Sequence, residues 1–148
     1  APQPETTPMS YITSAQMVLR FGAEISQLID RDNSGAEDTG VFAAVEADAA
    51  AVIDGYLRTA YTLPFATTPP QVVEIAGEIV RYKLWGARAP DEVRRRYEDA
   101  INRLRDIAKG LITLDDGTDT LDTAGLPITY TERDRTFDDD TLAAFVGS

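Results

Sequence analysis

The fold is decided by Pro90 to Leu114, which read PDEVRRRYEDAINRLRDIAKGLITL. Apolar residues recur there every three or four positions, so they share one face of a helix. They are Val93, Tyr97, Ala100, Ile101, Leu104, Ile107, Ala108 and Leu111. Charged residues occupy the other sides. A helix with one long apolar face must cover it, so we expect the rest of the chain to supply further helices that pack against it.

Both ends of this helix are marked in the sequence. Pro90 suits the first helical position, where the missing N–H has no intrahelical partner to lose. Asp91 and Glu92 place negative charge at the positive end of the helix dipole, and Lys109 places positive charge at the other end. Gly110 suits the position directly after a helix. The pattern predicts a helix over residues 90–110.

Three earlier segments also show helical periodicity. Residues 13–29 carry two short apolar faces separated by Gly22, and residues 39–60 carry one longer stripe. Residues 70–86 are apolar over more than half the circumference, and Gly77 within them indicates a close approach by another part of the chain. We expect the core to contain Phe42, Val52, Ile53, Tyr56, Val72, Ile75, Ile79, Tyr97, Ile101 and Leu104.

These segments predict an all-α fold, a small helical bundle of four to five helices with an extended C-terminal arm. Three parts follow from composition. Residues 1–8 are rich in proline and form a flexible N-terminal arm, residues 9–114 form the helical domain, and residues 115–148 form the extended C-terminal arm. The whole chain of 148 residues has the length of one domain.

Composition disfavours several classes of protein. The chain has no cysteine and no histidine, so it lacks thiolate chemistry, the side chain most used in acid–base catalysis and the commonest zinc ligands. We therefore expect no enzymatic activity, no metal and no other cofactor. No run of 18 apolar residues and no basic–apolar leader pattern is present, so we expect neither a membrane span nor a signal peptide.

The net charge of −11 is unevenly distributed. Residues 1–80 carry 3 Arg against 11 acids, residues 81–110 carry 9 Lys and Arg against 5 acids, and residues 111–148 carry 2 Arg against 9 acids. A mostly acidic protein does not bind DNA by neutralising phosphates. The basic block is expected to face acids of its own fold or of a neighbouring copy, with an acidic partner surface as the alternative.

One loop begins like a calcium site. From Asp30, acidic residues occupy positions one and three, Ser34 position five and Gly35 position six. Position twelve is Val41, where such a site requires a bidentate Glu. The interpretation we favour is a polar turn held by local side-chain to backbone hydrogen bonds, with an ion site as the alternative.

The C-terminal segment has few large apolar residues, and they fall in two clusters. Ile128 and Tyr130 lie in a β-prone stretch, and Phe137, Leu142 and Phe145 form a second group beside three consecutive aspartates. Neither cluster can bury itself within so short a tail. We expect these five residues to bind a partner, the first cluster by adding a strand and the second as a hydrophobic anchor.

Several short pieces, in this order and spacing, resemble the neck proteins of Mu-like phages and prophages. The resemblance covers about residues 9–114, with a weaker echo at residues 135–137 and Leu142. The pieces are Met9–Thr13, Arg20–Gly22, Leu28–Asp32, Ile53–Leu57, Tyr61–Pro64, Ile79–Tyr82, Arg96–Ala100 and Ile107–Gly110.

The resemblance implies a structural head–tail adaptor, with residues 9–114 as the adaptor domain. Such proteins form homo-oligomeric rings, usually of about twelve subunits, below the portal protein of the capsid. Implied partners are the portal and the next neck or tail-completion protein, and DNA passes the lumen without specific binding. The implied location is the neck of the virion, after assembly in the bacterial cytoplasm.

Two other classes of function remain open. A small helical binding or regulatory module would be favoured by a basic recognition helix, but acids interleave with the arginines of residues 90–110. An enzyme or calcium protein would depend on Asp30, Asp32 and Glu37, and Val41 argues against it. The head–tail adaptor is the interpretation we favour.

Overall fold

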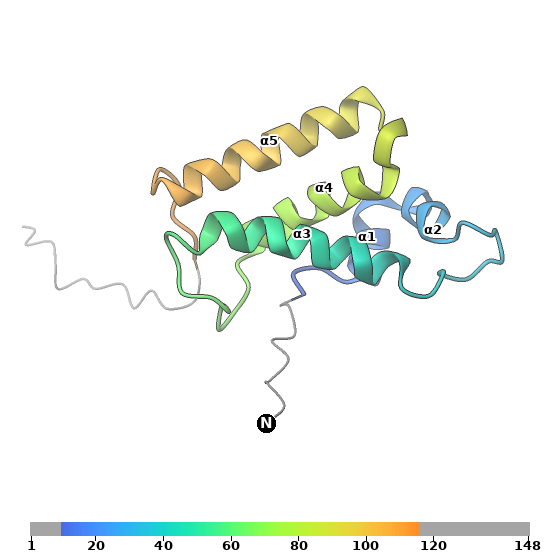
Figure 1. Cartoon of the computed structure of the whole chain (residues 1–148), viewed down its shortest axis with the longest axis horizontal. Helices are drawn as coiled ribbons and strands as arrows, with labels where there is room; N and C mark the ends of the chain where they lie inside the picture. Colours follow the sequence, from blue (N-terminus) through green and yellow to red (C-terminus); the bar gives the residue numbers. More distant parts are fainter. Residues whose placement is uncertain (1–9, 116–148) are drawn as a thin grey trace, which may run out of the picture. The chain divides into compact units, whose positions relative to one another are not determined.

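The computed structural model describes residues 10–115, and every regular element in that range is a helix (Figure 1). The elements are α1 (Ser14–Phe21), α2 (Ala23–Ile29), α3 (Val41–Leu57), α4 (Pro70–Trp85), the 3-10 turn η1 (Gly86–Arg88) and α5 (Asp91–Ala108). The predicted all-α bundle of four to five helices is confirmed for this part of the chain. The predicted arms at residues 1–8 and beyond Asp115 lie outside the described residues.

Three long helices form the body of the bundle. α3 and α5 run in the same direction, and α4 runs antiparallel to both and packs against both (Figure 1). α2 packs against α4 at the end of the bundle where α3 begins and α4 ends. None of the helices in residues 10–115 is long and apolar enough to cross a membrane.

α4 supplies the centre of the core, as its wide apolar surface predicts. Val72, Ile79 and Val80 have no exposed surface. Gly77 is also buried, and a Cβ atom added there would lie 3.4 Å from Ile12 Cδ1 and 3.5 Å from a ring carbon of Phe21. The close approach predicted at this glycine is therefore confirmed, and it is made by side chains of the N-terminal segment.

The segment before α1 is anchored onto α3. Tyr11 and Ile12 are 4% and 1% exposed. The Tyr11 backbone N–H donates to Glu46 Oε1 at 2.9 Å, and its phenolic O–H donates to Asp54. Both acceptors lie on α3, so this side chain and its backbone fix the start of the helical domain to the bundle. Burial, together with the Asp54 carboxylate, raises the pKa of Tyr11 well above its ordinary value.

The predicted ends of the last helix need correction. α5 begins at Asp91 with Pro90 as its N-cap, and Gly110 follows it with a φ of 78°, in the left-handed region. That turn takes the chain off the helical path, so the stripe ends before Leu111. Leu111 is 74% exposed, and the prediction that it lies on the buried face is wrong. Leu114 is buried instead, at 2% exposure.

Most of the predicted core is confirmed, with three corrections. Phe42, Ile53, Val72, Ile75, Ile79, Ile101 and Leu104 are buried. Val52, Tyr56 and Tyr97 are only partly buried. Their periodicity is right, but they line an open groove between α3 and α5, which leaves part of each side chain exposed. The Tyr97 ring stacks on Tyr82 of α4, with centroids 4.1 Å apart and ring planes 13° apart.

Candidate functional site

A hollow of about 740 Å³ lies between α2 and the corner that joins α4 to α5. Arg31, Lys83 and Arg88 line it, and none of them forms an ion pair with another residue of the described range 10–115. We call this site the cationic hollow. Its full lining is Glu24, Gln27, Leu28, Asp30, Arg31, Lys83, Leu84, Trp85, Gly86, Ala87 and Arg88.

A network centred on Glu24 forms one wall of the cationic hollow. Arg81 Nη2 and Nε donate to Glu24 Oε2 at 2.9 and 3.1 Å, and Trp85 Nε1 donates to Glu24 Oε1 at 2.6 Å. The Arg81 guanidinium also lies 4.8 Å from the centroid of the Phe21 ring. Glu24 is therefore neutralised by Arg81, and the wall presents the Trp85 ring rather than a free negative charge.

The balance of charge in the hollow is positive. Of its two acids, Glu24 is paired with Arg81, and Asp30 accepts hydrogen bonds from the backbone N–H groups of Ser34 and Gly35 at 2.9 and 2.8 Å. Arg31, Lys83 and Arg88 form no ion pair within residues 10–115, so the lining carries these three cations against the single carboxylate of Asp30. The hollow can therefore bind an anionic group beside an aromatic and aliphatic wall.

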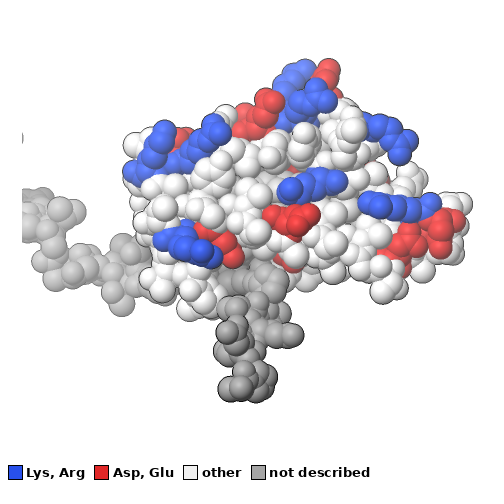
Figure 2. Space-filling view, in the orientation of Figure 1, with Lys and Arg blue, Asp and Glu red and all other residues white. Residues whose placement is uncertain are grey.

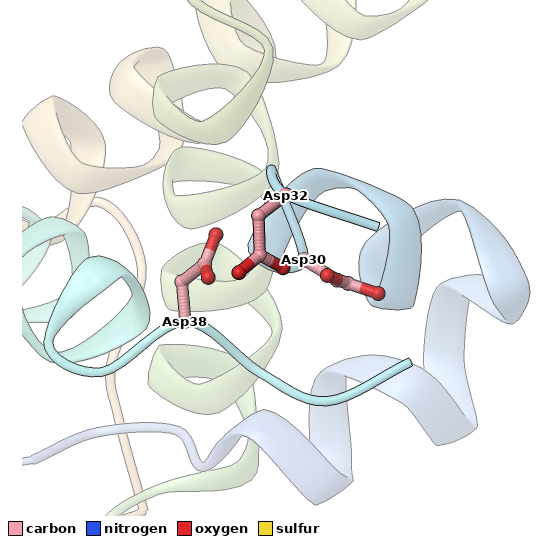
Figure 3. Close-up of side chains that lie close together, drawn as sticks. All are labelled: Asp30, Asp32 and Asp38. Carbon is pink, nitrogen blue, oxygen red and sulfur yellow. The ribbon is translucent and has the colours of Figure 1, made fainter. Parts of the chain in front are cut away.

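Three aspartates gather next to this site, where the chain leaves α2 and enters α3 (Figure 3). Each of Asp30, Asp32 and Asp38 offers a carboxylate oxygen, and these atoms lie within 4.8 Å of one another. Hydrogen bonds, mainly from Ser34, hold the pKa of Asp32 below its ordinary value. Two of the three acids named in the sequence analysis, Asp30 and Asp32, belong to this group, and Asp38 is its third member instead of Glu37.

The aspartate carboxylates stabilise the loop by accepting hydrogen bonds from its backbone N–H groups. Asp30 accepts the two backbone N–H groups noted above, and Asp38 Oδ2 accepts the N–H of Arg31 at 2.7 Å. Asn33 and Gly35 have positive φ angles of 57° and 86°, which the tight turn requires. The predicted polar turn with local backbone bonds is confirmed. Whether the loop also binds a cation stays a prediction, because carboxylates gather in turns without one.

The basic block of α5 is partly neutralised within the fold. Arg96 lies 3.4 Å from Glu78 and 3.2 Å from Glu92, and Arg103 lies 3.1 Å from Glu74. Figure 2 shows Lys and Arg side chains along the edge formed by α5, with acidic side chains between them, and further Lys and Arg side chains beside acidic ones elsewhere on this face. This arrangement bears out, for these residues, the expectation that the block faces acids of its own fold.

A further groove lies between α3 and α5, with a volume of about 460 Å³. It is lined by the three partly buried residues that the sequence assigned to the core, together with Ile101 and polar residues of α5. The lining is Val52, Tyr56, Tyr97, Glu98, Ile101, Asn102 and Arg105.

The residues predicted to bind a partner are Ile128, Tyr130, Phe137, Leu142 and Phe145. All five lie outside the described residues. The cationic hollow was not identified from the sequence, because its residues come from two separate stretches, residues 24–31 and 83–88. The signal available in the sequence was weak. Lys83 and Arg88 flank Trp85-Gly86, and Arg31 follows Asp30, the first aspartate of the loop.

Comparison with known proteins supplies the family. The Mu-like prophage FluMu protein gp36 of Haemophilus influenzae is 42% identical to this chain over 67 residues, which are 45% of this chain and 48% of that relative. The match thus spans about half the length of the curated relative. A family model described as Bacteriophage Mu, Gp36 matches residues 11–126, a range that includes all the described helices. The chain therefore belongs to the bacteriophage Mu Gp36 family.

Proposed function

We propose that this chain is a structural head–tail adaptor of a tailed phage, which forms a ring of about twelve subunits below the portal protein. The observation that carries the proposal is the family match over residues 11–126, which spans the entire helical core. The motif series of the sequence lies in the same range. The protein is a component of the virion neck in this proposal, and its next neighbour is a neck or tail-completion protein.

A structural rather than catalytic role agrees with the chemistry of the chain. It contains neither histidine nor cysteine, which supply most neutral-pH acid–base and thiolate catalysis. The cationic hollow contains cations, an aromatic ring and two engaged carboxylates. Such a lining suits binding of an anionic surface better than activation of a nucleophile.

Passage of DNA agrees with the charge of the chain. A formal net charge of −11 on each subunit gives a ring a strongly negative field. Phosphate groups are repelled by such a field, so DNA can pass through the lumen without binding there. A small helical DNA-binding regulator, the alternative considered above, would need a net positive face instead.

The C-terminal arm is the partner-binding element in this proposal. Ile128, Tyr130, Phe137, Leu142 and Phe145 contact a neighbouring adaptor subunit or the portal. Ordering such a segment costs about 1–2 kcal/mol per residue of backbone entropy, so its anchoring depends on contacts made in the assembled ring.

The proposal is tested by mixing the purified full chain with the portal of the same phage. Negative-stain microscopy and light scattering should show a ring on the portal, with a mass increase of about twelve subunits. A full-length variant with Phe137→Ala, Leu142→Ala and Phe145→Ala should assemble less well. A chain that remains separate from the portal across all concentrations, or binds it as a single copy, contradicts the proposed function.

A further inference from the structure

We propose that the cationic hollow receives the acidic C-terminal segment Phe137–Phe145 of a neighbouring copy of this chain. The inference rests on the proposed ring and names the contact that links one subunit to the next. It starts from three cations, Arg31, Lys83 and Arg88, which line one hollow without an ion-pair partner in residues 10–115.

The segment and the hollow are complementary in charge. Phe137 is followed directly by Asp138, Asp139 and Asp140, so three negative charges stand beside one aromatic ring. The hollow offers three unpaired positive charges beside the Trp85 ring. Residues 116–148 contain eight Asp and Glu against two Arg, so the whole segment is drawn toward a basic site.

The two are also complementary in their apolar parts. Leu28, Leu84 and Trp85 give the hollow an apolar wall next to its cations. The segment continues past its aspartates with Leu142 and Phe145, which have no core of their own in the sequence. A volume of about 740 Å³ is within the range of sites that enclose a compact ligand, so it accommodates a few side chains.

The proposed ring requires a contact between copies, and the end of the described chain and the cationic hollow lie at opposite ends of α4. The described chain ends at the start of α4, where the Leu114 N–H donates to the Tyr61 hydroxyl at 2.9 Å. The cationic hollow lies at the other end of α4, which is about 24 Å long at 1.5 Å per residue. A contact from one end of a subunit to the opposite end of the next is heterologous, and heterologous contacts form a ring when the rotation between copies closes.

The linking stretch is long enough for such a contact. Between Asp115 and Phe137 the chain can span up to about 70 Å when extended. That reach exceeds the length of the bundle. The segment can therefore reach the hollow of a second copy as well as that of its own chain, and the mixing experiment below distinguishes the two.

The first experiment measures binding of a labelled peptide, residues 131–148, to the full chain. The receptor carries Asp138→Lys, Asp139→Lys and Asp140→Lys, so its own segment does not compete. Trp85 is the single tryptophan of the protein, so its emission reports occupancy of the hollow. We expect saturable binding that changes this emission and weakens as salt rises.

Charge reversal in the hollow should weaken that binding. Lys83→Glu with Arg88→Glu is expected to reduce affinity on the order of 10- to 100-fold, the effect of losing and reversing a few partly exposed ion pairs. Arg58→Glu with Arg95→Glu is the matched control, because it changes net charge equally and neither residue lines the hollow. Equal weakening in both variants, or no saturable binding up to millimolar peptide, overturns the inference.

The second experiment distinguishes a contact between two copies from a contact within one chain. A hollow variant (Lys83→Glu, Arg88→Glu) and a segment variant (Asp138→Lys, Asp139→Lys) are each expected to assemble poorly on the portal. Mixing the two full-length variants should restore assembly, because the reversed segment of one fits the reversed hollow of the other. If every variant forms rings on the portal regardless of these charges, this inference is contradicted, while the adaptor function is supported. Peptide binding in the hollow of a chain that forms no ring supports the contact in the hollow and contradicts the adaptor function.

Discussion

The ion pair that joins α2 to α4 allows a quantitative test of how burial sets the strength of a charge contact. Glu24 and Arg81 side chains are 25% and 14% exposed, and their closest N–O distance is 2.9 Å. Hydrogen bonds to charged partners contribute about 1.5–3 kcal/mol in such settings. Removing the carboxylate leaves a guanidinium that is largely shielded from water, which adds to the cost. We expect Glu24→Gln to destabilise the fold by roughly 2 kcal/mol.

A double-mutant cycle isolates the contact itself. Glu24→Gln, Arg81→Met and the double variant are unfolded in urea, with helical circular dichroism and Trp85 fluorescence as two readouts. Arg81→Met keeps the aliphatic stem of the side chain, so packing is largely conserved. The coupling free energy is expected at about 1–2 kcal/mol, since neighbouring charged residues are not additive.

The chain contains a matched exposed pair. Arg103 and Glu74 also join two helices, with a distance of 3.1 Å, but their side chains are 55% and 52% exposed. The same cycle there should give a coupling between about 0 and 1 kcal/mol, at the lower end in high salt. If the two cycles give equal coupling, distance alone sets the strength and the reasoning from burial is refuted.

Four further predictions concern the core, the anchor and the acidic loop. Gly77→Ala should change stability by less than about 1 kcal/mol, while Gly77→Leu should cost about 1–3 kcal/mol in urea unfolding, because the added atoms meet packed side chains. Ile101→Asp should cost about 4 kcal/mol or more, whereas Leu111→Asp, at an exposed position, should leave the melting temperature nearly unchanged. The pKa of Tyr11 is raised in the fold from an ordinary 10.0, so its stabilising effect is full below pH 10 and is lost as pH rises above it. Tyr11→Phe should therefore flatten the alkaline loss of stability in melts between pH 8 and pH 11, taken as a range around that value. Melts with calcium and with chelator should coincide if residues 30–38 only form a turn, whereas an ion in roughly 1,000-fold excess over its dissociation constant would add about 4 kcal/mol.

The parts of the fold that follow from local periodicity could be predicted from the sequence. α4 has the predicted bounds to within one residue, and α3 is two to three residues shorter at each end than its apolar stripe. Helix type depends on which residues recur along one chain segment, and that information is local. The all-helical class and Gly77 packing were predictable for the same reason.

The burial of Leu111 was predicted wrongly because the backbone changes direction at a single residue, Gly110. Leu111 continues the stripe of α5 in sequence, but the left-handed turn at Gly110 redirects the backbone. Leu114 then reaches the core and its N–H meets the hydroxyl of Tyr61. A glycine signals that a helix ends, and it does not say which of the following residues is buried.

The cationic hollow could not be predicted, because its parts meet only in the folded bundle. Glu24 and Arg81 are separated by 57 positions, and Glu24 and Trp85 by 61. Nothing local to either stretch indicates the pairing. The packing of α2 against the end of α4 brings them together, and that packing depends on crossing geometry rather than on periodicity.

The basic block between residues 81 and 110 was expected to face acids of its own fold or of another copy, and its members divide by position. On α5, Arg96 and Arg103 form ion pairs with Glu78 and Glu74 of α4, so their charges are neutralised within the same chain. At the corner between α4 and α5, Lys83 and Arg88 line an open hollow and form no ion pair within residues 10–115. A charge left unmatched at a concave site attracts an opposite charge from outside. In the contact proposed above, the acidic segment of a second copy supplies that charge at the corner.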